Sequence, residues 1–288
     1  MRKRRTGLEL PGRAALVTGA ARGIGLDTAR RLAARGCGVA LVDRDGDLAA
    51  HEARTLGPRA LAMGADVADR PAMEAAVAEA VERFGGLDVV VANAGVSPPS
   101  LTLLAMTPEQ FDHVVDINLA GVWHTTKAAL PHVVARRGHV LVVASIYAAV
   151  NGVLHAPYAV SKAAVEALGR ALRVELAQHG ASAGVAYFGF IDTAMVREAF
   201  SRPVIQELMP ALPEALRRPV PVGRAGEAIV RGIERRSARV AVPGWVAPLL
   251  ALRGLSPAFD RRLLGDEHVR AAIARAEGEA SSPGARLE

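Results

Sequence analysis

Residues 14–25 read Ala-Ala-Leu-Val-Thr-Gly-Ala-Ala-Arg-Gly-Ile-Gly, and this stretch decides the fold class. The apolar run over residues 14–18 is typical of a buried parallel strand, and the helical pattern that follows indicates a helix beginning in the glycine-rich turn. Glycine allows close approach of the backbone to a bound group, while free amides at a helix N-terminus stabilise a phosphate. The stretch therefore predicts a pyrophosphate-binding turn, with an ordinary strand-to-helix turn as the alternative. The turn residues are Thr18, Gly19, Arg22, Gly23, Ile24 and Gly25.

Further along the chain, short Val-rich runs alternate with longer amphipathic patterns. The strand-like runs cover residues 38–42, 60–63, 87–91, 139–144, 182–187 and 239–242. This alternation predicts an α/β fold: a single-domain, Rossmann-like, doubly wound parallel sheet of about seven strands with helices on both faces. We expect one dinucleotide-binding and catalytic domain over residues 10–265, between a flexible basic tail (1–9) and a flexible C-terminal tail (266–288).

The composition fits a globular protein and argues against several classes of function. The net charge is +6, but the Lys and Arg residues are scattered over helical segments, so we expect no nucleic-acid partner. The single cysteine, Cys37, excludes an intrachain disulfide. No stretch reads as a signal peptide or a transmembrane helix, so we expect a cytoplasmic protein.

Asp43 ends the second strand-like run, eighteen positions after Gly25. A carboxylate there can accept hydrogen bonds from the adenosine ribose and repels a 2′-phosphate, which favours NAD over NADP. Arg22 and Arg44 argue the other way, because a guanidinium near this point can pair with a phosphate. Asp43 as a simple surface or capping acid is the alternative.

Tyr158 and Lys162 lie four residues apart in a segment that reads as helical, so both side chains share one face. A nearby ammonium favours the phenolate and lowers the pKa of a tyrosine. Such a pair is often purely structural, so the polar residues at neighbouring strand ends decide whether it is catalytic. Ser145, residues 93–95 and Asp66 follow three other strand-like runs, at the carboxyl edge where doubly wound folds bind ligands. We therefore predict that Tyr158 exchanges a proton with a substrate oxygen that Ser145 polarises.

These motifs together resemble the classical short-chain dehydrogenase/reductase family over roughly residues 10–245. The resemblance implies an NAD(P)-dependent oxidoreductase that moves a hydride between nicotinamide C4 and a secondary alcohol or ketone, without a metal. Tyr158 would be the acid/base, Ser145 would orient the substrate, and Lys162 would bind the nicotinamide ribose and tune the tyrosine. Asn118 would hold a water in the proton relay. The other implied cofactor contacts are Asp66 and Val67 at the adenine, Asn93, Ala94 and Gly95 beside the cofactor, and Ile191 and Thr193 at the carboxamide.

The resemblance also implies that residues 194–222, rich in Pro, Leu and Arg, form a lid over the substrate. The family's Pro-Gly after the sixth strand is here Phe188-Gly189, so Phe188 either extends an apolar substrate wall or is a core aromatic. The apolar bias of the candidate pocket predicts a lipophilic or cyclic alcohol or ketone. The candidate pocket residues are Val96, Ile146, Tyr147, Val153, Phe190 and Met195.

The apolar stretch 243–253 is too short and too interrupted by proline to span a membrane. We expect it to pack against protein, with docking on a membrane surface as the alternative. The family resemblance implies a homodimer or homotetramer. A catalytically silent dinucleotide-binding sensor of the same fold is the alternative function, and the intact Ser145, Tyr158 and Lys162 disfavour it. The single residue between Gly23 and Gly25 disfavours an epimerase or dehydratase of the extended branch.

Overall fold

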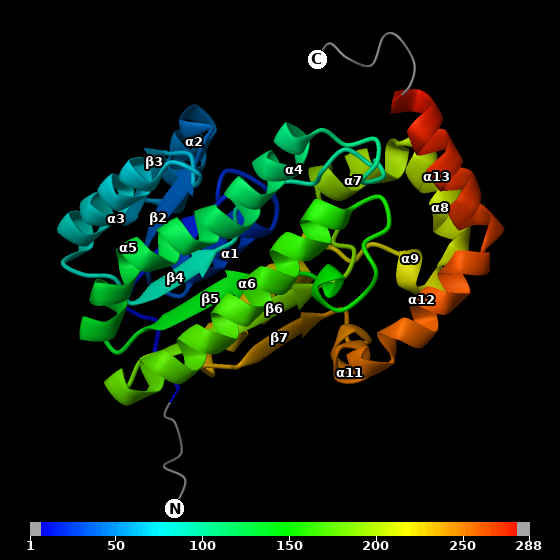
Figure 1. Ribbon diagram of the computed structural model, residues 1–288. Helices are drawn as coiled ribbons and strands as arrows, with labels where there is room; N and C mark the ends of the chain where they lie inside the picture. The colour runs from blue at the N-terminus through cyan, green and yellow to red at the C-terminus, as the bar shows by residue number, and fades with distance from the viewer. Residues whose placement is uncertain (1–6, 281–288) are drawn as a thin grey trace, which may run out of the picture.

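Seven parallel strands form the centre of the computed structural model, which describes residues 7–280 (Figure 1). Their order in the sheet is β3-β2-β1-β4-β5-β6-β7. The strands are β1 (Ala14–Thr18), β2 (Gly38–Asp43), β3 (Ala60–Gly64), β4 (Val89–Ala92), β5 (His139–Val143), β6 (Ser182–Phe188) and β7 (Arg239–Val242). Each coincides with a strand-like run of the sequence, which confirms the predicted doubly wound parallel sheet.

The helices that flank the sheet are α1 (Gly23–Ala34), α2 (Gly46–Leu56), α3 (Arg70–Phe84), α4 (Pro108–Val115), α5 (Gly121–Ala135), α6 (Ala156–Glu175) and α10 (Val222–Glu234). A π-helical turn, η1 (Asp116–Ala120), joins α4 to α5, and short 3-10 turns are η2 (Ile146–Ala148) and η3 (Leu176–His179). The lid region holds α7 (Ala194–Ser201), α8 (Pro203–Leu208), η4 (Met209–Ala211) and α9 (Glu214–Arg217). After β7 come α11 (Val246–Ala251), η5 (Arg253–Leu255), α12 (Ser256–Gly265) and α13 (Glu267–Ala280).

The sheet is buried on both faces, which explains why its strands read as continuous apolar runs. Ala14 and Leu16 point into the core on the side of α3, α5 and α6, whereas Ala15 and Val17 point into the core on the side of α1 and α10. Successive side chains of a strand alternate between faces, so one apolar run supplies both cores. Figure 1 shows α3, α5 and α6 in front of the sheet.

The order of the strands reverses between β1 and β4, because β2 and β3 lie on one side of β1 and β4 to β7 on the other. In doubly wound folds, ligands bind in the crevice outside the carboxyl ends of the strands at this point. The fold therefore places the residues that follow β1 and β4 at the expected binding position.

Both ends of the described chain are packed, which corrects the predicted tails. Val269, Ala272 and Ala276 of α13 are buried against α8, so the expected flexible tail is helical and packed over Glu267–Ala280. Leu8 is also buried, and its N–H donates to the Glu234 carbonyl at 2.7 Å. The rest of the predicted tails, residues 1–6 and 281–288, lies outside the described residues.

The apolar stretch 243–253 contributes to the core through α11. Val246 and Leu250 are buried on the α6 side of the sheet, while Leu252 is exposed. None of the helices within residues 7–280 combines the length and the apolar character needed to cross a membrane.

Candidate active site

Backbone conformation or close contacts favour glycine at three positions of the turn between β1 and α1. Gly19 and Gly23 have φ values of +62° and +57°, a left-handed conformation that favours glycine. A Cβ on Gly25 would lie 2.1 Å from the Gly19 carbonyl oxygen. The first turn of α1 therefore lies directly against the loop at the carboxyl edge of the sheet. Free amides in this position fit a pyrophosphate, while Ile24 packs against the core behind them.

Thr18 joins the ends of β1 and β4. Its Oγ1 accepts hydrogen bonds from the backbone N–H groups of Asn93 and Ala94, both at 3.1 Å. The Asn93 Nδ2 in turn donates to the carbonyl oxygens of Thr18 at 3.0 Å and of Gly19 at 3.3 Å. The predicted cofactor residues of the two strands thus form one connected edge.

Asp43 holds the glycine turn as well as ending β2. Its Oδ2 accepts from the Ala21 N–H at 3.0 Å, and its Oδ1 accepts from the Asp45 N–H at 3.1 Å. Arg22 is ion-paired with Asp45 at 2.6 Å, and their side chains are 62% and 42% exposed. Arg44 is exposed. One of the two guanidinium groups that could attract a 2′-phosphate is therefore already paired.

Asp66 and Val67 follow β3 at the same edge. The Ala65 N–H donates to the Asp43 carbonyl at 3.0 Å, which places this segment beside the end of β2. Asp66 is exposed and accepts a backbone hydrogen bond at 2.9 Å. Val67 is buried, and its carbonyl lies 3.0 Å from His124 Nδ1. An adenine contact of these two residues stays a prediction.

Ser145 and Tyr158 line the same cavity, although they come from the end of β5 and from α6. The buried Ser145 Oγ donates to the Phe188 carbonyl at 3.4 Å and accepts from the Tyr147 N–H at 3.3 Å. The Tyr147 and Tyr158 rings meet edge to face, with centroids 5.6 Å apart. Burial raises the pKa of Tyr158, and a hydrogen bond with Ser145 offsets part of that shift. At neutral pH the phenol is therefore protonated and able to donate to an oxygen in the cavity.

Burial is the largest influence on the pKa of Tyr158, and it raises that pKa. The Lys162 Nζ lies 5.5 Å from the centre of the Tyr158 ring, so the two side chains share one helix face as predicted. Lys162 is buried, and its Nζ donates to the Val143 carbonyl at 3.0 Å. Burial lowers the pKa of Lys162 to about 8. Removal from water disfavours both charged forms, which is why the sequence expectation of a lowered tyrosine pKa is not met.

Asn118 lies buried in the π-helical turn, a feature often found at functional sites. Its Oδ1 accepts from the Val96 N–H at 2.8 Å, and its Nδ2 donates to the Val96 carbonyl at 3.0 Å and to Ser161 Oγ at 3.3 Å. A Cβ on Gly95 would lie 2.9 Å from Asn118 Oδ1 and 3.4 Å from Lys162 Nζ. Asn118 and Lys162 thus meet at Gly95. The Asn118 side chain holds the Val96 backbone, so a relay water would have to be held by the backbone of Asn118.

The cavity beside Ser145 has a volume of about 140 Å³ and a mostly apolar wall. Of the predicted pocket residues, Ile146, Tyr147, Val153, Phe190 and Met195 line it. Val96 does not line the cavity; its side chain packs against the core on the α6 side of the sheet. Sequence reasoning did not name Ser97, Asn151, Val196, Ala199, Phe200, Ile205, Leu208, Met209, Ala211, Leu212 and Leu263 as pocket residues. Most of these belong to the predicted lid, and the apolar residues of that segment could have indicated that it lines the pocket.

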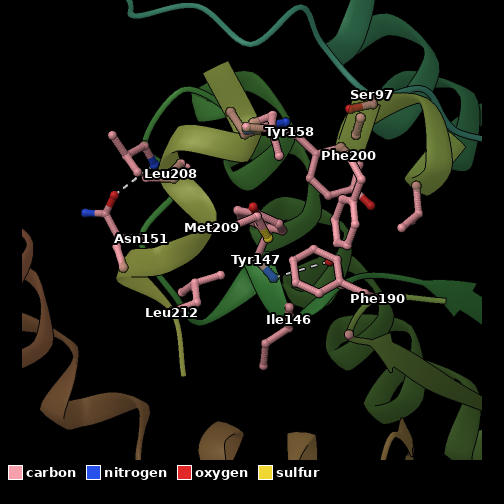
Figure 2. Close-up of a pocket in the computed structure, with 18 of the residues that line it drawn as sticks. Ser97, Ile146, Tyr147, Asn151, Tyr158, Phe190, Phe200, Leu208, Met209 and Leu212 are labelled. Carbon is pink, nitrogen blue, oxygen red and sulfur yellow. Dashed lines mark hydrogen bonds between the residues drawn. The ribbon is translucent and has the colours of Figure 1, made fainter. Parts of the chain in front are cut away.

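Figure 2 shows how the lid closes this cavity. Phe190 and Phe200 meet edge to face with centroids 4.9 Å apart, and Leu208 and Leu212 approach from the other side. His155 also lines the cavity; it is buried, and burial lowers its pKa to about 4. The cavity is therefore lined by neutral groups at neutral pH, which suits a lipophilic molecule.

The loop after β6 reaches back to the glycine turn. Phe188 is buried in the core on the α1 side and does not line the cavity, so it is a core aromatic. A Cβ on Gly189 would lie 3.0 Å from the Trp245 ring. Thr193 caps α7, and its Cγ2 would lie 3.6 Å from a Cβ on Gly23. Ile191 is buried two residues earlier. The structure thus brings this loop next to the glycine turn, and a carboxamide contact of Ile191 and Thr193 stays a prediction.

Comparison with known proteins agrees with this arrangement. The family model described as short chain dehydrogenase matches residues 13–203. The short-chain reductase protein NovJ of Streptomyces niveus is 43% identical over 192 residues, which are 65% of this chain and 72% of NovJ. A (−)-trans-carveol dehydrogenase of Rhodococcus erythropolis is 35% identical over 203 residues, 65% of this chain and 73% of that enzyme.

Among solved structures, a 3-ketoacyl-(acyl-carrier-protein) reductase from Brucella melitensis complexed with NADH is similar, with a TM-score of 0.70 and 28% identity. The match covers 81% of this chain and 97% of that one. The residues matched by the family model include the glycine turn, Ser145, Tyr158 and Lys162. The chain therefore belongs to the short-chain dehydrogenase family of oxidoreductases.

Proposed function

We propose that the chain transfers a hydride between nicotinamide C4 of NAD(H) or NADP(H) and the carbon of a secondary alcohol or ketone. One observation carries the proposal: Ser145 and Tyr158 line the same mostly apolar cavity at the carboxyl edge of the sheet. The neighbouring glycine turn fits a pyrophosphate, and the similar Brucella melitensis reductase was solved with NADH. When bound, the nicotinamide supplies or accepts the hydride.

In the direction of reduction, Tyr158 donates a proton to the substrate oxygen, and the Ser145 hydroxyl donates a hydrogen bond to the same oxygen. Burial raises the pKa of Tyr158, so the phenol is ready to donate at neutral pH. Lys162, with a pKa lowered to about 8, titrates close to neutral pH and lies beside Tyr158. It is therefore the group placed to return a proton toward the tyrosine. Oxidation of an alcohol needs the phenolate and so gains rate as pH rises.

The cavity favours a lipophilic or cyclic substrate. Phe190, Phe200, Leu208 and Leu212 supply apolar walls, and burial keeps His155 neutral. Carveol, the alcohol named for the Rhodococcus erythropolis relative, is a cyclic alcohol of this kind. A panel of hydrophobic secondary alcohols and ketones, read by nicotinamide absorbance with both cofactors, identifies the class.

Substitution of the tyrosine tests the assignment of the acid/base. Tyr158→Phe removes the hydroxyl but keeps the ring, and we expect kcat/KM to fall about 10²–10⁴-fold while NADH still binds. Ala167→Ser is a matched control, because Ala167 lies on the same helix and is exposed. Unchanged turnover in Tyr158→Phe would refute the assignment. NADH binding without turnover of any substrate by the wild type would favour the silent sensor.

We infer a preference for NAD over NADP from the ion pair between Arg22 and Asp45. Asp45→Ala frees Arg22 to pair with a 2′-phosphate, which a charge-assisted hydrogen bond stabilises by roughly 1.5–3 kcal/mol. We expect the ratio of NADPH to NADH affinity to rise about tenfold, measured by cofactor fluorescence titration. Asp47→Ala is the control two residues away. An unchanged ratio in Asp45→Ala would show that the ion pair does not set the preference.

We also infer a homo-oligomer, as the family resemblance implies. Trp123 on α5 and Val160 and Val174 on α6 are apolar side chains with exposures of 39%, 52% and 77%. Exposed apolar residues on neighbouring helices favour a protein contact. Light scattering of the purified chain measures the assembly, and a monomer at micromolar concentration would contradict the inference.

A further inference from the structure

Helix α8 packs against two partners at once. Ile205 and Leu208 line the cavity. The same helix joins Val269, Ala272 and Ala276 of α13 in an apolar cluster separate from the two cores of the sheet. Figure 1 shows α13 running alongside α8 at the lid end of the sheet. The wall of the cavity formed by α8 is therefore backed by the C-terminal helix.

Two ion pairs connect residues 252–280, which we call the C-terminal strap, to the lid and to the catalytic helix. Arg275 of α13 pairs with Glu207 of α8 at 2.6 Å. Arg253 pairs with Glu166 of α6 at 2.6 Å, and the Glu166 side chain is only 7% exposed. Glu166 follows Lys162 by four residues, on the helix that also carries the catalytic tyrosine. The strap thus spans from the catalytic helix to the lid.

The strap also reaches the cavity itself, because Leu263 of α12 is one of the lining residues. The preceding lid helix is held differently: none of the residues of α7 is buried, whereas α8 buries Val204, Ile205 and Leu208. Within the lid, α8 and the following turn η4 contact α13. The position of α8, and with it the depth of the cavity, therefore depends on the strap.

The strap lies outside the part matched by the family model, which ends at residue 203. The Brucella melitensis reductase is matched over 97% of its own chain but covers only 81% of this one. This chain therefore carries residues that the solved relative lacks. The apolar contact between α13 and α8 lies beyond the residues that the family model matches, at the helix that forms one wall of the cavity.

We propose that the C-terminal strap fixes α8 against the cavity and so limits the size of the substrate that the active site accepts. The proposal deepens the proposed function and rests on it for the substrate. Val269, Ala272 and Ala276 are positioning residues, since they act on the substrate through α8. Small side chains at 272 and 276, both fully buried, let the two helices approach closely.

A matched pair of full-length variants tests the proposal. Ala272→Glu places a charge in the buried contact with α8, and Ala274→Glu makes the same change at an exposed position of the same helix. Amide hydrogen exchange over residues 203–211 measures how firmly α8 is held. A homologous series of ketones of increasing size, assayed with NADH, measures the size limit.

We expect Ala272→Glu to speed exchange in α8 at least about tenfold while exchange in β1 and β4 is unchanged. KM for the smallest ketone that the wild type reduces should rise about tenfold with kcat little changed, and larger ketones should become substrates. Ala274→Glu should match the wild type in both measurements. If Ala272→Glu does not fold, Ala276→Ser gives a milder change in the same cluster.

Unchanged exchange in α8 would overturn the idea that the strap fixes the lid. Faster amide exchange in α8 together with an unchanged limit on ketone size would overturn the idea that the strap limits the size of the substrate. Absence of ketone turnover by the wild type would instead refute the proposed function and the size limit with it, while the exchange measurement would still decide whether the strap holds α8.

Discussion

Replacing Thr18 with Val tests whether the contact between β1 and β4 stabilises the cofactor edge. Valine has nearly the shape of threonine but no acceptor, so the N–H groups of Asn93 and Ala94 lose the partner that they now share at 3.1 Å. An unpaired buried donor costs roughly 1–3 kcal/mol. Both donors are only partly buried, so we expect a loss of about 2–4 kcal/mol in the free energy of unfolding. Against a typical total of about 5–15 kcal/mol this is a large fraction.

Urea unfolding followed by circular dichroism measures this loss as a shift of the midpoint at constant slope. Thr18→Ser is the control: it keeps the acceptor and loses one methyl group, for which burial contributes about 0.8 kcal/mol. The expected order of stability is wild type, then Ser, then Val. NADH affinity should fall in the same order, because Asn93 and Ala94 flank the glycine turn. A Val variant as stable as wild type, or a Ser variant as unstable as Val, would refute the role of the hydroxyl.

Two further predictions concern His155 and Gly25. Because burial lowers the pKa of His155 from 6.5 to about 4, the unfolded chain binds a proton that the native chain does not between these values. The free energy of unfolding should therefore fall by up to about 3 kcal/mol as pH drops from 6.5 to 4. In His155→Gln, urea midpoints measured over the same pH range should fall less. The same pH dependence in the variant and in the wild type would contradict the prediction. Gly25→Ala should abolish NADH binding, because the new Cβ would lie 2.1 Å from the Gly19 oxygen. Gly244→Ala, with nothing within 4 Å, should bind NADH normally, and equal binding by both variants would show that the turn is not the cofactor site.

Local features of the sequence were enough for the fold and for the cofactor edge. The strands are buried on both faces, so their apolar runs stand out without knowledge of their partners, and β1 (Ala14–Thr18) was predicted with its observed bounds. The glycine turn follows from the same logic, since a positive φ and a missing Cβ are properties of single residues. The spacing of Tyr158 and Lys162 fixed their common face because a helix repeats every 3.6 residues.

Features that depend on contacts between distant segments could not be predicted from local sequence patterns. The side-chain amide of Asn118 hydrogen-bonds the Val96 backbone. Asn118 is placed there by a π-helical turn, which no repeating pattern of the sequence predicts. The C-terminal helix was predicted to be part of a flexible tail, and only its packing on α8 shows that Ala272 and Ala276 are buried.

The same division holds for the chemistry at Tyr158. Its neighbours along the helix, read from the sequence, indicated a lowered pKa, because Lys162 is a local feature. The structure reverses the direction, because burial depends on how the lid, β5 and α6 come together around the phenol. The sequence by itself determined which groups are present and on which face they lie. Only the tertiary structure decided how much water reaches them, and desolvation is a property of the whole surrounding volume.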